Sequence, residues 1–140
     1  MTPTLEKNLD AFYRRILRIS INYRYPKTIS NDKLYTLTQE TPISHKIRKR
    51  RLTLFGHILR LDPETPVQKA LQFYMTPHPR PVGRPPLTWI TLISKDLEKT
   101  LKHHNIKTPL IYESLEKLKI LAEDRTIWRK EILRNKDRNI

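Results

Sequence analysis

From residue 44 to residue 61 the sequence reads Ser44-His45-Lys46-Ile47-Arg48-Lys49-Arg50-Arg51-Leu52-Thr53-Leu54-Phe55-Gly56-His57-Ile58-Leu59-Arg60-Leu61. Five cations crowd its first half, apolar side chains fill its second half, and no acid occurs in it. Apolar residues spaced by four, seven, four and three predict one face of a helix, formed by Ile43, Ile47, Leu54, Ile58 and Leu61. Leu52, Phe55 and Leu59 widen this face. Because charged groups are rarely buried unpaired, the basic half must face water or an anionic partner.

The rest of the chain also predicts helices, and no convincing strand pattern or internal repeat occurs. Thr-Pro dipeptides at 2–3, 41–42, 65–66 and 108–109 predict helix starts, because the Thr hydroxyl caps a free amide and Pro needs no donor there. Ser30 is expected to cap a short helix. The predicted helices span about 3–21, 31–39, 42–61, 66–74, 86–104, 110–121 and 123–135. The first has an apolar face of Leu5, Leu9, Phe12, Ile16 and Ile19.

Residues 76–86 contain five prolines in eleven residues, which favours an extended backbone. We therefore predict an all-α fold, a compact multi-helix domain with a Pro-rich extended loop in its middle. A length of 140 residues fits one domain. Within it we expect a basic N-terminal helical half (1–75), the Pro-rich loop (76–86) and a C-terminal helical half (87–140).

The charge balance predicts a polyanionic partner. Lys and Arg number 28 against 14 acids, a net charge of +14, and residues 1–61 carry 13 of the cations with only four acids. The absence of Cys fits a reducing compartment, and no apolar run approaches a membrane span. The N-terminus does not resemble a signal peptide. We expect a nuclear or cytoplasmic protein with no membrane partner, and two glycines exclude Gly-rich phosphate loops.

We predict that the basic cluster binds RNA or DNA through phosphate contacts. The candidate nucleic-acid-binding residues are Lys46, Arg48, Lys49, Arg50, Arg51, Arg60, Arg80, Arg84, Arg14 and Arg18. Two plainer interpretations stay open. The cluster can be a solvated helix face, and Arg80 and Arg84, which could enter a narrow minor groove, can belong to a connector merely rigidified by prolines.

Catalytic and metal-binding patterns are missing. A nuclease would need converging carboxylates and a lysine, but no Asp/Glu-x-Lys motif occurs. His103 and His104 point in different directions on a helix, and His57 is interpreted as a packed, hydrogen-bonded histidine. We predict no catalytic residue, no metal site, no cofactor and no small-molecule substrate.

The remaining aromatic and charged residues predict structural roles. Core packing is favoured over base stacking for Phe12, Phe55, Trp89 and Trp128. Asp124 and Arg125 are expected to form an ion pair or a helix cap near Trp128.

Three blocks of the sequence, in order, resemble one family. Residues 50–61 are similar to the block RRLRWLGHVLRM, residues 83–89 to GRPRKRW, and residues 122–129 to AxDRxxWR. Segments 9–19 and 29–34 also resemble that region. The blocks mark the segment that follows the reverse transcriptase domain in LINE-type (non-LTR) retrotransposon polyproteins. Leu54 stands where family members carry Trp, and Val82 stands where Arg is common.

The resemblance implies a piece of a reverse transcriptase or endonuclease–reverse transcriptase protein. The polymerase motif Tyr-x-Asp-Asp is absent, so we expect a non-catalytic region that holds RNA or target DNA. A reverse transcriptase domain is a further expected partner. Two alternatives stay open: a helical interaction module that docks on a polymerase or host protein, and a decayed element fragment without activity.

Overall fold

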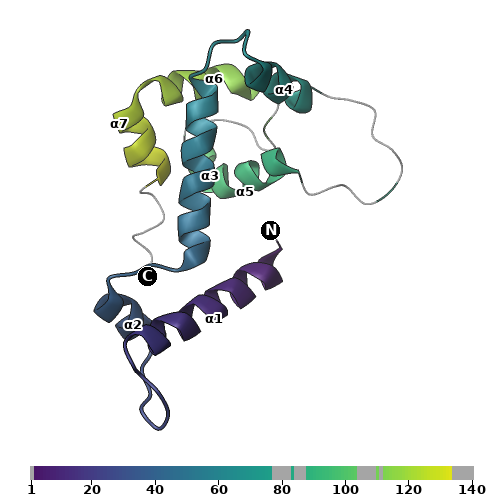
Figure 1. Ribbon diagram of the computed structural model, residues 1–140. Coiled ribbons are helices and arrows are strands. Elements are labelled where there is room, and N and C mark those ends of the chain that lie inside the picture. Colours follow the sequence, from purple (N-terminus) through teal and green to yellow (C-terminus); the bar gives the residue numbers. More distant parts are fainter. Residues whose placement is uncertain (1, 77–82, 84–87, 104–109, 111, 134–140) are drawn as a thin grey trace. The chain divides into compact units, whose positions relative to one another are not determined.

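The computed structural model describes residues 2–76, 83, 88–103, 110 and 112–133. Regular structure in these residues is entirely helical (Figure 1), which confirms the all-α prediction. The helices are α1 (Pro3–Ser20), α2 (Asn31–Thr38), α3 (Ile43–Leu59), α4 (Pro66–Met75), α5 (Trp89–His103), α6 (Tyr112–Glu123), α7 (Arg125–Ile127) and a π-helical turn, η1 (Trp128–Leu133). None of the described helices is long and apolar enough to cross a membrane.

Three of the predicted helix starts are built as expected. The hydroxyls of Thr2, Ser30 and Thr65 accept hydrogen bonds from backbone N–H groups three residues later, at 3.3, 3.3 and 3.4 Å. These bonds satisfy donors that have no partner inside the helix. At the start of α3 the tether is different. Asp10 accepts from the backbone N–H of Ser44 at 3.0 Å and from its hydroxyl at 2.7 Å.

The chain divides into two compact units, Met1–Lys49 and Arg50–Ile140, with the division inside α3. In the first unit only Leu17 and Leu34 are buried apolar side chains among the described residues. The predicted apolar face of α1 is largely exposed, because Leu5, Phe12, Ile16 and Ile19 keep 44–60% of their surface. Phe12 is therefore not a core residue.

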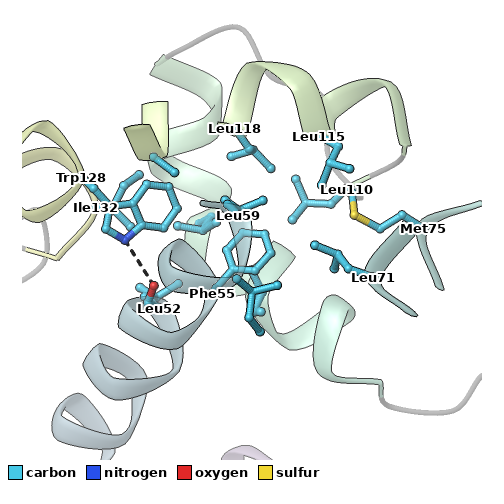
Figure 2. Packing of buried hydrophobic residues seen from close by; sticks show 14 residues of the cluster. Leu52, Phe55, Leu59, Leu71, Met75, Leu110, Leu115, Leu118, Trp128 and Ile132 are labelled. Carbon is cyan, nitrogen blue, oxygen red and sulfur yellow. Dashed lines mark hydrogen bonds between the residues drawn. The ribbon is translucent and has the colours of Figure 1, made fainter. Parts of the chain in front are cut away.

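The second unit has a continuous hydrophobic core (Figure 2). Its buried members are Leu52, Phe55, Ile58, Leu59, Leu71, Met75, Ile93, Leu97, Leu110, Leu115, Leu118, Ala122, Trp128 and Ile132. Phe55 is fully buried at the centre. Its ring meets Trp89 edge-on at 5.8 Å and Trp128 at 6.2 Å between centroids. The core role predicted for Phe55 and Trp128 is confirmed, and Trp89 is half-buried and packs against this core.

The buried face of α3 contains Ile58 of the predicted stripe and the three residues expected to widen it, but it does not contain Leu54. Leu54 is 51% exposed, whereas Leu52, Phe55, Gly56 and Leu59 are buried. Gly56 allows Trp128 to approach this face closely, because a Cβ at this position would lie 2.6 Å from Cε2 of Trp128. The indole packs directly on the glycine backbone and donates from Nε1 to the carbonyl of Leu52 at 3.2 Å (Figure 2).

Candidate nucleic-acid interface

The first cation of the basic cluster, Lys46, is engaged inside the first unit. Its ammonium pairs with Glu40, donates to the Tyr13 hydroxyl at 3.0 Å and lies 5.2 Å from the centre of that ring. The bond to Glu40, then that to Tyr13, raises the pKa of Lys46. The same bonds lower the pKa of Glu40. Lys46 therefore stabilises the loop before α3 as well as adding positive charge.

The last cation of the cluster, Arg51, is engaged inside the second unit. Its guanidinium lies 3.2 Å from the carboxylate of Asp96 on α5, with side chains only 10% and 18% exposed. Removing one partner of a nearly buried ion pair strongly destabilises the folded protein, because the other charge is left without compensation. Arg51 thus contributes to the packing of α3 on α5, and a substitution there tests folding together with binding.

The middle of the cluster contains its most exposed side chains. Lys49 and Arg50 are exposed, and Arg48 is partly buried. Because Lys49 and Arg50 are consecutive on an acid-free helix, they present two positive groups on α3. These two side chains are the best placed of the five for phosphate contacts.

The remaining predicted cations fall in different places. Arg18 donates to Asn31 Oδ1 at 2.9 Å and to the carbonyl of Ile29 at 3.5 Å, so it ties the end of α1 to the start of α2. Arg14 is partly buried on α1. Arg80 and Arg84 lie outside the described residues, and so do most of the Pro-rich loop and His104.

Arg60 lies in a pocket that sequence reasoning did not find. The pocket has a volume of about 290 Å³, and its lining residues are Thr53, His57, Arg60, Arg125, Trp128 and Arg129. Thr53, His57 and Arg60 follow a spacing of four and three along the chain from α3. Arg125 and Arg129 are four residues apart across α7 and η1. All six belong to the second unit.

Arg60 is fixed in this pocket by a backbone contact. Its Nη1 donates to the carbonyl of Ala122 at 2.9 Å, and its buried Nε has no hydrogen-bond partner in the described part of the chain. Burial lowers the pKa of Arg60, and the positive charges of Arg125 and Arg129 lower it further. Repulsion among the three guanidinium groups of this pocket is therefore unfavourable for folding.

Asp124 precedes α7, which carries Arg125, and η1, which carries Arg129, follows α7 directly. Its carboxylate caps α7 by accepting from the backbone N–H groups of Thr126 at 2.7 Å and Ile127 at 3.2 Å. Hydrogen bonds from the Thr126 hydroxyl and from these two amides lower the pKa of Asp124. The predicted cap near Trp128 is confirmed, and the described ion pairs do not include Asp124 with Arg125.

The pocket joins two sequence blocks that are more than sixty residues apart. Gly56, His57 and Arg60 belong to the first block, and Arg125, Trp128 and Arg129 to the third. Sequence reasoning assigned His57 to packing, but its side chain is exposed at the pocket. Arg125 and Arg129 were not among the candidate residues. The signal available was their four-residue spacing, which places both on one side of a helix.

A second, apolar concavity of about 450 Å³ lies elsewhere in the second unit. Its lining includes Ile58, Leu71, Tyr74 and Trp89. It offers little for holding an anion. No group of three or more potential metal ligands occurs in the part of the chain that the structure describes.

Comparison with protein-family models, with curated proteins and with solved structures gives no match for this chain.

Proposed function

We propose that this chain binds nucleic acid without catalysing a reaction, as the post-polymerase region of a LINE-type retrotransposon protein. The supporting observation is the placement of charge. The chain carries +14, and Lys49 and Arg50 extend from an acid-free helix with exposed side chains. Phosphate contacts from such cations supply affinity and release counterions. RNA and DNA both offer this chemistry.

The family part of the proposal has its own support. The first and third blocks of the resemblance pack together: Trp128 of the third lies on Gly56 of the first and bonds to Leu52. Residues that make the resemblance therefore also make the centre of one folded unit. A segment with this order of blocks would hold element RNA or target DNA near a polymerase domain.

The test is fluorescence anisotropy of a labelled single strand and a labelled duplex, over a salt series. We plot the logarithm of the association constant against the logarithm of the salt concentration. The slope should correspond to about four to six phosphate contacts, at about 0.9 per phosphate for duplex and about 0.7 for single strand. The variant Lys49→Gln/Arg50→Gln should lower the duplex slope by about 1.8, because two phosphates lose their partners. Lys46 and Arg51 are left intact because both hold the fold.

The control variant is Lys95→Gln/Lys117→Gln, which removes the same charge from two exposed positions of α5 and α6. We expect its slope to equal that of the unchanged chain. Absent binding at low salt would overturn the proposal. An equal decrease of the salt slope in both variants would show that only the total charge matters and that α3 has no special role in binding.

A second candidate function follows from α1. Leu5, Phe12, Ile16 and Ile19 lie on one face of this helix and are exposed, and such a face suits a protein partner. A helical interaction module would associate through apolar area and persist at high salt, whereas phosphate-driven binding falls steeply. Association with a polymerase domain that resists high salt and is lost in Phe12→Asp would favour this function.

A further inference from the structure

The pocket between α3 and the α7–η1 segment has the composition of an anion site. Three arginines and one histidine line it, together with the hydroxyl-bearing Thr53, and no carboxylate is among the described lining residues. The nearest acid in sequence, Asp124, accepts bonds from Thr126 and Ile127. Nothing described in the pocket compensates its positive charge.

The positions of the cations are fixed by packing and not by attraction. Trp128 lies between Arg125 and Arg129 in sequence and is held on Gly56 and Leu52 in the core. Arg60 is anchored by the carbonyl of Ala122. The fold thus forces three guanidinium groups toward one cavity although they repel, which is the arrangement expected of a preorganised binding site.

The buried Nε of Arg60 is a second, independent observation. A buried donor without a partner is unfavourable because its lost hydration is not replaced, and Arg60 lines the pocket. An anion in the pocket would lower this cost and offset the repulsion among the three cations. Arg60, Arg125 and Arg129 offer planar forks of donors that match a tetrahedral oxyanion.

The size of the pocket also restricts the ligand. At about 290 Å³ it is at the lower end of small-molecule sites, which span about 300–1,000 Å³. This volume holds a phosphate with its attached sugar. The indole N–H of Trp128 is already donated to Leu52, so Trp128 supplies an apolar wall and the arginines supply the donors.

We propose that this pocket binds one phosphate group. The pocket would be a discrete site for one phosphate of a bound strand. The strand as the source of this phosphate rests on the proposed function, whereas the pocket itself does not. A free phosphate ester would use the same chemistry. The two sources are separated by the experiment.

The first measurement uses the two tryptophan indole N–H signals of the ¹⁵N-labelled chain. Trp128 lines the basic pocket and Trp89 the apolar one, so Trp89 serves as an internal reference. We expect inorganic phosphate to shift the Trp128 signal saturably and to leave Trp89 unchanged. Sodium chloride at matched ionic strength should shift neither. The variant Arg125→Gln/Arg129→Gln should abolish the phosphate effect; both side chains are exposed, so the fold is retained.

The second measurement repeats the nucleic-acid titration with this variant and with Lys95→Gln/Lys117→Gln. Two arginines that hold one phosphate contribute one counterion-releasing contact, so the duplex slope should fall by about 0.9. Affinity should fall about tenfold beyond the control pair. A strand that perturbs Trp128 in the unchanged chain identifies the strand phosphate as the ligand.

The outcomes separate the two proposals. Strand binding with no change at Trp128, and no response to phosphate, would overturn the pocket and leave the proposed function standing. A saturable phosphate shift without strand binding would establish the pocket as a site for free phosphate esters and overturn the proposed function. A phosphate shift retained in Arg125→Gln/Arg129→Gln would also overturn the pocket.

Discussion

The two units of this chain are both helical, but different interactions hold them. The first, residues 1–49, buries only Leu17 and Leu34 among its described apolar side chains and relies on caps and side-chain tethers. The second, residues 50–140, buries fourteen of its described side chains in one core. Its polar contacts serve that core, as in the bond from Trp128 to Leu52. Substitutions of apolar residues should therefore matter in the second unit, and polar tethers in the first.

The largest expected effect separates a core aromatic from an exposed one. Trp128→Ala should lower the free energy of unfolding by about 3–5 kcal/mol, because it opens a cavity beside Phe55 and removes the hydrogen bond to the Leu52 carbonyl. Phe12→Ala in the first unit should change it by less than about 0.5 kcal/mol, because Phe12 is 60% exposed. Urea unfolding followed by circular dichroism measures both. Equal losses would contradict the contrast between the units.

A smaller effect is expected at the glycine beneath the indole. Gly56→Ala should destabilise by about 1–3 kcal/mol, because the added Cβ collides with Trp128. Helix propensity alone predicts the opposite sign, a gain of about 1 kcal/mol. In a Trp128→Leu background the cost of Gly56→Ala should shrink, since the colliding ring is gone. An unchanged cost in that background would place its cause elsewhere in α3.

Much of the fold could be predicted from local signals. Threonine and serine caps, proline at the first helical position and apolar spacing located the helices, because these signals act within a few residues. The apolar period also predicted four of the residues on the buried face of α3, but it did not predict the exposure of Leu54. Leu54 fits the apolar period as well as Leu52 does. Leu52 is buried on the side of α3 that contacts Trp128, and this contact involves a residue far along the chain.

The same limit applies to the candidate site. The basic cluster was visible as a run of sequence, but the structural roles of Lys46 and Arg51 within it depend on Glu40, Tyr13 and Asp96. The pocket of Arg60 depends on contacts across 62 residues to Ala122. Only the four-residue spacing of Arg125 and Arg129 was available in the sequence, and it does not reveal what the two side chains face.

In the first unit, a polar tether should have the largest effect. Asp10→Ala removes both hydrogen bonds to Ser44 at the start of α3, and we expect a loss of about 1–2 kcal/mol. Amide exchange at Ser44 and in the following turn should accelerate, while the amide of Leu118 in the second core should not. Asp32→Ala, an exposed acid of α2, is the matched control. Uniform acceleration in both units would mean that they open together.

The smallest effect concerns two solvent-accessible carboxyl groups whose pKa values are lowered for different reasons. A hydrogen bond from the Lys46 ammonium lowers the pKa of Glu40 in the first unit, below its ordinary 4.5. Bonds from the neutral Thr126 hydroxyl and backbone amides lower the pKa of Asp124 in the second, below its ordinary 3.8. In both cases the ionised form favours the folded state. The stabilisation is therefore present above the ordinary pKa and is lost as the pH falls through the lowered one.

Salt should distinguish these two carboxyl groups. Raising sodium chloride to about 1 M shortens the Debye length to about 3 Å and weakens an exposed ion pair far more than a bond to a neutral donor. We expect the pKa of Glu40 to rise toward 4.5 while that of Asp124 stays low, as followed by ¹³C carboxyl shifts in a pH titration. Lys46→Met should reproduce the salt effect at Glu40 alone, because it removes the ammonium that lowers this pKa. A salt-dependent pKa at Asp124 would show that a cation, and not the cap geometry, stabilises the start of α7, and the neighbouring Arg125 would then be committed to Asp124 and not to the pocket.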